Sequence, residues 1–186
     1  MTTICPICNH NNQKIKTAFP YETYFNNRRF RYARCVKCNS TYMVNILNKR
    51  DLKKIYEKNK YHKVYYNNNS KISINPRLKK IINNLDTKEI NFCDFGCGNG
   101  NLLNFLSLNY NKFGVEFSSH LVKELNLRFK NINFFETNDF FKSKKFKNFF
   151  DIIYIGDVLE HLQEPFSIIK KLSIFLKKNG FFIIEG

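Results

Sequence analysis

The spacing of apolar residues changes near residue 90. Short apolar runs, each of the length expected for a buried strand, cover 90–96, 112–116, 132–136, 150–155 and 180–185. Amphipathic stretches over 101–106 and 165–178 separate some of these runs and predict helices. The alternation predicts an α/β domain in which helices cover both faces of a parallel sheet.

The part of the chain before this domain follows other patterns. A stretch over 51–66 opens on Asp51, a favourable N-cap residue, and a second amphipathic stretch covers 76–85. Both predict helices, and a polar run over 67–70 separates them. The predicted organisation is an N-terminal module over 1–48, a helical linker or lid over 49–88, and the α/β domain over 89–186.

Four of the six cysteines form two C-x-x-C pairs, Cys5 with Cys8 and Cys35 with Cys38. This spacing lets the two thiolates of one tight turn reach a single tetrahedral ion. Four thiolates close the coordination sphere, so the predicted role of the metal is structural. Zinc is the expected ion. An iron–sulfur site and unligated cysteines are the alternatives, since thiolates alone do not distinguish zinc from iron. The segment between the pairs alternates aromatic and basic residues, as a hairpin of a zinc ribbon would.

Charge modifies this picture only moderately. The chain has 31 Lys and Arg against 15 Asp and Glu, a formal net charge of +16. Its lysines occur as short pairs spread along the sequence, which favours solvated helix and loop surfaces over a nucleic-acid footprint. RNA remains an alternative partner for the basic surface and the ribbon. No apolar run has the roughly 18 residues of a membrane span, and the expected location is cytoplasmic.

A glycine-rich turn follows the first predicted strand of the α/β domain. Its pattern, Asp94-x-Gly96-x-Gly98-x-Gly100, differs from the G-x-G-x-x-G of dinucleotide sites. It resembles the first motif of class I S-adenosylmethionine-dependent methyltransferases. The resemblance implies a Rossmann-like fold, with the turn passing beneath the amino acid part of the cofactor and Asp94 orienting it.

Further motifs follow in the order of that family. The second strand ends at Glu116, where a carboxylate can accept hydrogen bonds from both ribose hydroxyls. The third strand leads to Asn138 and Asp139, and the resemblance implies that this acid contacts the adenine amino group. The segment from Gly156 to Leu162, Gly-Asp-Val-Leu-Glu-His-Leu, resembles the family's fourth motif. The cofactor-binding residues so implied are Asp94, Phe95, Gly96, Cys97, Gly98, Gly100, Glu116, Asn138, Asp139, Gly156 and Asp157.

His161 and Glu160 are the candidate catalytic residues. Methyl transfer needs an aligned nucleophile and, for some acceptors, a base, and the pKa of histidine lies near neutrality. A helical segment here would place Asp157, Glu160 and His161 on one face. Three alternatives stay open: the pair could brace the local structure or contact the cofactor, it could bind a metal with Asp157, or His62 could serve as the base.

The resemblance favours a small or carrier-linked acceptor, such as a sugar or a cell-surface polysaccharide precursor. No Asn-Pro-Pro-Tyr-like sequence follows the fourth strand, which disfavours methylation of base amines. An RNA methyltransferase is the second candidate. The family sheet normally has two strands beyond the fifth, so the core is expected to be incomplete, and an inactive remnant that binds cofactor and zinc is the third candidate. The oligomeric state is left open.

Overall fold

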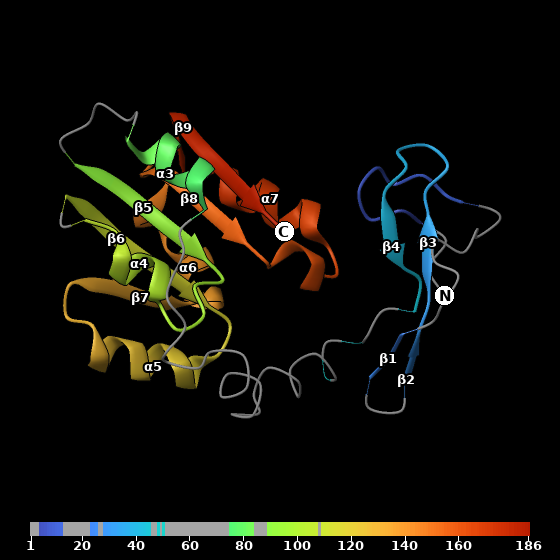
Figure 1. Ribbon diagram of the computed structural model, residues 1–186, viewed down its shortest axis with the longest axis horizontal. Helices are drawn as coiled ribbons and strands as arrows, with labels where there is room; N and C mark the ends of the chain where they lie inside the picture. The colour runs from blue at the N-terminus through green and yellow to red at the C-terminus, as the bar shows by residue number, and fades with distance from the viewer. Residues whose placement is uncertain are drawn as a thin grey trace.

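The computed structural model describes residues 4–12, 23–25, 28–45, 48, 50, 75–83, 89–107 and 109–186 (Figure 1). The predicted helix over 51–66, with His62 in it, lies outside the described residues. Within these ranges, no helix has the length and apolar character that crossing a membrane would require.

The described residues of the N-terminal module include two short antiparallel hairpins and an isolated antiparallel bridge between Ile4 and Asn11. β1 (Thr23–Phe25) pairs with β2 (Arg28–Phe30), and β3 (Tyr32–Arg34) pairs with β4 (Thr41–Met43). The β1–β2 pair confirms the hairpin that the alternation of aromatic and basic residues predicts. Ala33 on β3 and Tyr42 on β4 are buried against the cysteines, which gives this small module a compact centre.

A five-stranded parallel sheet forms the α/β domain and confirms the predicted fold class. Its strands are β5 (Ile90–Phe95), β6 (Tyr110–Glu116), β7 (Ile132–Glu136), β8 (Phe150–Gly156) and β9 (Leu176–Glu185). They lie in the order β7-β6-β5-β8-β9, and every neighbouring pair is parallel. From β5 the chain adds β6 and β7 on one side of this strand, and it then crosses over to add β8 and β9 on the other side. Ligands of such sheets bind outside the carboxyl ends of the strands at this switch point.

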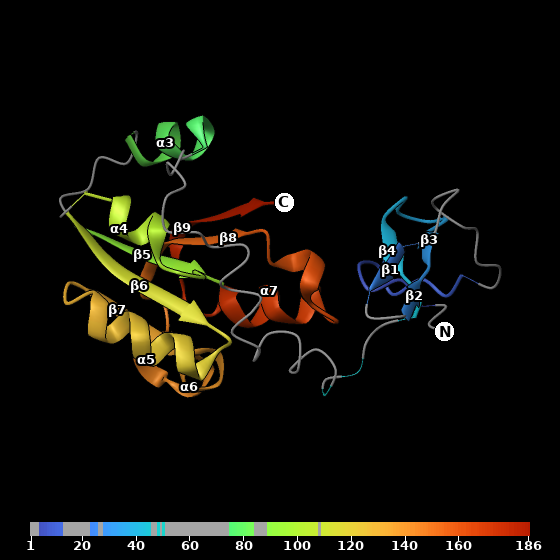
Figure 2. The same cartoon turned by 60° about the horizontal axis from the view of Figure 1, so that its bottom comes forward.

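Helices cover both faces of the sheet, as the alternating pattern predicts. One apolar layer joins β5 and β7 to α3 (Pro76–Asn83), α4 (Asn101–Phe105) and α5 (Ser119–Arg128). The other layer contains α6 (Thr137–Lys142), the 3-10 turn η1 (Lys144–Phe146) and α7 (Pro165–Ser173). Figure 2 shows α3 and α7 on opposite sides of β8 and β9. Because both faces of β5 are covered, five of its six residues are buried.

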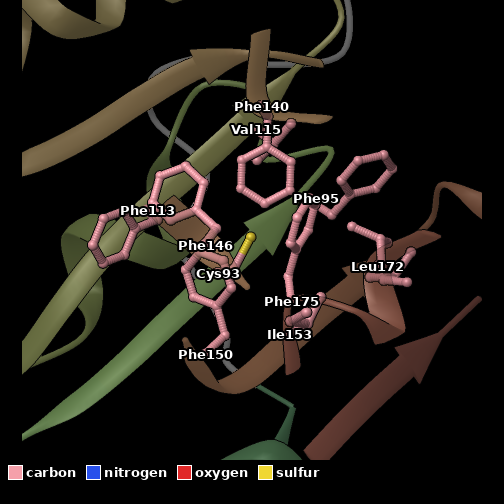
Figure 3. Packing of buried hydrophobic residues seen from close by; sticks show 11 residues of the cluster. Cys93, Phe95, Phe113, Val115, Phe140, Phe146, Phe150, Ile153, Leu172 and Phe175 are labelled. Atoms are coloured by element: carbon pink, nitrogen blue, oxygen red, sulfur yellow. The ribbon is translucent and has the colours of Figure 1, made fainter. Parts of the chain in front are cut away.

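Phenylalanine rings fill the second apolar layer (Figure 3). The Phe140 ring centroid lies 5.1 Å from those of Phe146 and Phe175, and Phe113 lies 5.3 Å from Phe150 in an edge-on arrangement. Aromatic pairs at these separations add to the stabilisation that burial alone provides. Buried phenylalanines therefore supply much of the core of the α/β domain, in a chain that has no tryptophan.

The connection from α7 to β9 differs from the prediction. The helix expected over 165–178 ends at Ser173, and β9 begins at Leu176, ahead of the strand expected from residue 180. Phe175 turns into the phenylalanine layer, and its carbonyl accepts hydrogen bonds from the backbone N–H groups of Phe149 and Phe150. Lys177 pairs with Asp151 at 2.8 Å, beside an irregularity in the β8–β9 register. Contacts with β8 therefore end the helix early.

Candidate cofactor site and four-cysteine centre

The glycine-rich turn lies at the carboxyl end of β5, the central strand. Gly96, Gly98 and Gly100 have φ values of +87°, +52° and +74°, in the left-handed region that favours glycine. A Cβ atom at Gly96 would lie 2.2 Å from Cγ2 of Val158, so this position has no room for a larger residue. The backbone N–H groups of Gly96 and Cys97 both donate to the carbonyl of Val115, which fastens the turn to β6.

Glu116, at the end of β6, holds the middle of this turn. One carboxylate oxygen, Oε2, accepts from the N–H of Gly98 at 3.1 Å. The other, Oε1, accepts from the N–H groups of Phe117 and Ser118 at 2.7 and 3.2 Å. A carboxylate offers about four acceptor positions, so the three bonds leave capacity for a ligand hydroxyl. The backbone therefore already orients the carboxylate that is expected to contact the ribose.

Asp94 lies one strand away from Glu116 and is buried, with 4% of its surface exposed. Burial, and secondarily the negative charge of Glu116, raises the pKa of Asp94 to about 7. Burial likewise raises the pKa of the Cys93 and Cys97 thiols, which keeps them protonated and unreactive. A cationic group bound at this edge would favour the ionised form of Asp94.

The adenine-side candidates lie on the neighbouring element. Asn138 and Asp139 occupy the first turn of α6, directly after β7, and both are exposed. β7 pairs with β6 in a register that sets Glu136 opposite Glu116. The expected ribose and adenine contacts therefore come from adjacent strand ends.

The fourth motif does not form the single helical face that was expected. Gly156 ends β8, Asp157 has a φ of +51°, and the following 3-10 turn η2 covers only Leu159–His161. The expectation of a shared face was wrong for Asp157, because its left-handed backbone interrupts the helical spacing. Glu160 and His161 are exposed on η2, outside the buried group formed by Asp94 and Glu116.

A hydrogen-bonded pair beside this motif was missed in the sequence. The Tyr154 hydroxyl donates to Oε2 of Glu185 at 2.9 Å, and Asn75 donates to the other oxygen of the same carboxylate. Burial, followed by the bond to Glu185, raises the pKa of Tyr154 well above its usual range. A Cβ atom at Gly156 would lie 2.3 Å from the Tyr154 hydroxyl oxygen, so the glycine makes room for this pair. No local sequence pattern signals contacts between positions so far apart.

Asn99, between two glycines of the turn, was also missed. Its side-chain oxygen accepts from the N–H of Asn101 at 3.3 Å, whereas its buried Nδ2 has no hydrogen-bond partner among the described residues. Buried donors are nearly always paired in folded proteins, with protein, water or a ligand. The place of Asn99 inside the glycine motif was the only available signal.

The four cysteines converge in the N-terminal module, as their spacing predicts. Their sulfur atoms lie within 4.8 Å of one another, with Cys5 to Cys38 at 3.7 Å and Cys8 to Cys35 at 3.6 Å. Tetrahedral zinc with bonds of about 2.3 Å to sulfur requires sulfur separations of about 3.8 Å. These separations are far longer than a disulfide bond, and the geometry fits one structural zinc ion.

The two halves of this four-cysteine centre are built alike. In each, the N–H of the first cysteine donates to a carbonyl five residues on, from Cys5 to His10 and from Cys35 to Ser40, both at 2.9 Å. The residue after each pair, Asn9 or Asn39, has a φ near +60°. Its backbone N–H donates to the carbonyl of the first cysteine of that pair at 3.0 Å. Asparagine tolerates this left-handed conformation better than most residues. A hydrogen bond with the Ser40 hydroxyl lowers the pKa of the Cys38 thiol to about 6, which favours the thiolate that binds metal.

Solved structures of several proteins resemble the chain. A TehB-like S-adenosylmethionine-dependent methyltransferase from Corynebacterium glutamicum is 16% identical with a TM-score of 0.51, and the match covers 74% of this chain and 73% of that one. The structure of an S-adenosyl-L-methionine-dependent methyltransferase from Methanococcus maripaludis gives 19% identity, a TM-score of 0.50, and coverage of 76% and 66%. The PH0226 protein from Pyrococcus horikoshii is 23% identical with a TM-score of 0.49, covering 57% of this chain and 53% of its own. The first two matches show a likeness of fold alone.

The match to PH0226 spans only about half of that protein's length. No curated protein sequence matches the chain significantly. The sequence profile of a methyltransferase-domain family matches residues 70–185, which is more than half of the chain. The matched segment contains the whole sheet together with the glycine-rich turn and Glu116. The chain therefore belongs to the methyltransferase-domain family, that of the class I S-adenosylmethionine-dependent methyltransferases.

Proposed function

We propose that this protein binds S-adenosylmethionine at the carboxyl end of its sheet and transfers the methyl group to a small or carrier-linked metabolite. The observation that carries the proposal is the bridge from Glu116 to the Gly98 N–H, which joins two adjacent strand ends into one prepared site. When bound, the cofactor supplies a methyl carbon activated by a sulfonium. The protein's own task is then to bind, align and exclude water.

The site residues divide this task by position. Asp94 and the glycine turn receive the amino acid part of the cofactor, and Glu116 accepts hydrogen bonds from the ribose hydroxyls. Asn138 and Asp139 contact the adenine, with Phe95, Cys97, Gly156 and Asp157 completing the walls. Any proton that the acceptor loses would pass to His161, which follows Glu160 in the sequence, or to water.

The charge of this edge supports the proposed class of acceptor. Asp94, Glu116, Asp157 and Glu160 all lie at or just beyond strand ends, in a chain whose total charge is strongly positive. Acidic side chains at this edge of the sheet favour a cationic cofactor and repel the phosphates of a nucleic acid. This supports an uncharged acceptor atom, such as a sugar hydroxyl of a cell-surface polysaccharide precursor, over a site within RNA.

Calorimetric titration tests the cofactor half of the proposal. S-adenosylmethionine and S-adenosylhomocysteine should bind the wild-type protein saturably, and Glu116→Gln should weaken both at least tenfold. Glu124→Gln is the matched control, since Glu124 is exposed on α5 and should leave the affinity unchanged. Absence of binding by a folded, zinc-loaded protein would refute the proposed function.

Transfer of a labelled methyl group tests the acceptor half. Nucleotide sugars and carrier-linked sugars should be labelled, with rates that change little between low and moderate salt. The chain's net charge of +16 makes RNA the second candidate, and RNA labelling that falls steeply with salt would favour it. Cofactor binding without labelling of any acceptor would instead favour a binding remnant.

A further inference from the structure

Lysines that lie far apart in the sequence come together on one surface of the α/β domain. Segments 142–147 and 170–178 each contain four lysines, and neither contains an acidic residue. The first segment ends α6 and forms η1, and the second ends α7 and begins β9. Lys177 is paired with Asp151. Six of the others, all exposed, form what we call the lysine patch: Lys142, Lys144, Lys145, Lys147, Lys170 and Lys171.

Backbone and ring contacts hold the two segments of the patch together. The N–H of Asn148 donates to the carbonyl of Ile174 at 3.0 Å, so the chain just after Lys147 contacts the end of α7. From α7, the Nζ atom of Lys171 lies 5.7 Å from the centroid of the Phe141 ring on α6. The phenylalanine layer of Figure 3 joins α6, η1 and α7 beneath the lysines. The patch is therefore one surface supported by a packed aromatic layer.

The composition of this surface indicates the chemistry of its partner. Both segments contain lysine without arginine, and lysine acts as a flexible point charge, whereas arginine makes planar, bidentate contacts with phosphate. Lys145 and Lys171 lie over phenylalanine rings, so these rings are covered and cannot stack on bases. Ile174, at the junction of the two segments, is 54% exposed. Clustered lysines around an exposed aliphatic side chain fit an anionic lipid surface better than a nucleic acid.

We propose that the lysine patch is a docking surface for a membrane that contains anionic lipids. The lysine ammonium groups approach the lipid phosphates, and the Ile174 side chain enters the boundary between headgroups and acyl chains. Such attachment is peripheral and weakens with salt, because mobile ions screen exposed charges. The inference goes beyond the proposed methyl transfer and holds for any acceptor.

The position of the patch in the fold sets the orientation of the docked domain. Lys147 precedes the amino end of β8, and Lys170 and Lys171 precede the amino end of β9. Asp94 and Glu116 lie at the carboxyl ends of their strands, which form the opposite edge of this parallel sheet. An anionic surface attracts the lysine-rich edge and repels the acidic one. Docking therefore leaves the cofactor edge facing away from the lipid.

Sedimentation with vesicles tests the inference on the full, zinc-loaded chain. One set of vesicles contains phosphatidylcholine and phosphatidylglycerol in a two-to-one ratio, and the other contains phosphatidylcholine alone. The wild-type protein should bind the first set more tightly, and added salt should weaken this binding steeply. Combining Lys144→Glu, Lys147→Glu and Lys170→Glu should weaken it at least about tenfold. Ile174→Ser alone should weaken it at least about twofold, because it removes the apolar contact and leaves every charge in place.

The matched control makes the same change in net charge on other elements. It combines Lys79→Glu and Lys80→Glu on α3 with Lys123→Glu on α5, all at exposed positions. This control should weaken vesicle binding by no more than about threefold, since salt screens charges far from the lipid. Circular dichroism checks that both triple variants are folded, and Ile174→Ser keeps the test decisive if the patch variant is not.

Four results would overturn the inference. Equal weakening by the patch variant and the control would mean that total charge, and not the patch, attracts the vesicles. Equal binding of the wild-type protein to both kinds of vesicle would exclude a role for anionic lipid. Failure of the wild-type protein to bind vesicles at low salt would also overturn it, and so would patch-dependent binding of RNA in place of vesicles.

Discussion

Replacing Asp94 with asparagine should change how the stability of the ligand-free protein depends on pH. Asp94 is buried beside Glu116, and burial raises its pKa from 3.8 to about 7. The folded protein therefore holds this proton more tightly than the unfolded chain does. It follows that the stabilising contribution of protonated Asp94 is complete below pH 3.8 and is lost as the pH rises toward 7.

The size of the effect follows from that difference in pKa. Each pKa unit corresponds to about 1.4 kcal/mol, so ionising Asp94 in the folded protein costs about 4 kcal/mol in full. Of this total, about 3 kcal/mol should appear as a change in the free energy of unfolding between pH 5 and pH 8. Asparagine keeps the shape of the side chain and does not ionise, so it should remove this part of the pH dependence.

The measurement is urea unfolding of both proteins at several pH values from 5 to 8, with zinc present throughout and circular dichroism as the signal. The free energy of unfolding of the wild-type protein, relative to Asp94→Asn, should fall by about 3 kcal/mol over this range. Because both proteins share every other titrating group, the difference isolates Asp94. Parallel pH profiles would refute the buried, proton-binding state of this carboxyl.

Three other outcomes are expected. Cys35→Ser should abolish the binding of one zinc ion per chain, measured by metal analysis after dialysis, whereas retention of one tightly bound ion would contradict a four-thiolate centre. Gly96→Ala should destabilise the protein by at least about 2 kcal/mol in thermal unfolding, and Val158→Ala should recover only part of this, because the clash is relieved but the φ of +87° remains. Tyr154→Phe should cost about 1–3 kcal/mol by leaving the Glu185 carboxylate with one donor fewer, and an unchanged urea midpoint would argue against that bond.

Local signals predicted the elements of the α/β domain. The apolar run over 132–136 predicted both ends of β7 correctly. The order of amino acids alone was enough to identify the glycine-rich turn. The boundary between α7 and β9 was predicted wrongly, because the helical pattern continues to residue 178 while Lys177 pairs with Asp151 on β8. A contact between residues 26 positions apart leaves no trace in the spacing of apolar residues.

The site was predictable to the same extent. Cys5 and its three partners converge because C-x-x-C spacing has a direct geometric meaning, and Glu116 lies at the strand end that its position suggested. The unpaired amide of Asn99 depends on where neighbouring donors are used, which only the folded chain reveals. The shared face expected for Asp157 failed for a related reason, since one left-handed residue is enough to interrupt helical spacing.

The matching halves of the four-cysteine centre affect how the ion stabilises the module. Each C-x-x-C turn has its own internal hydrogen bonds, so the cysteines within a turn need little rearrangement to meet an ion. The main conformational cost is closure of the 27-residue separation between Cys8 and Cys35. A crosslink over such a loop removes about 3.5 kcal/mol of chain entropy from the unfolded state by the loop-closure estimate. Zinc would thus act on this module as a reversible crosslink that depends on metal supply instead of on oxidation.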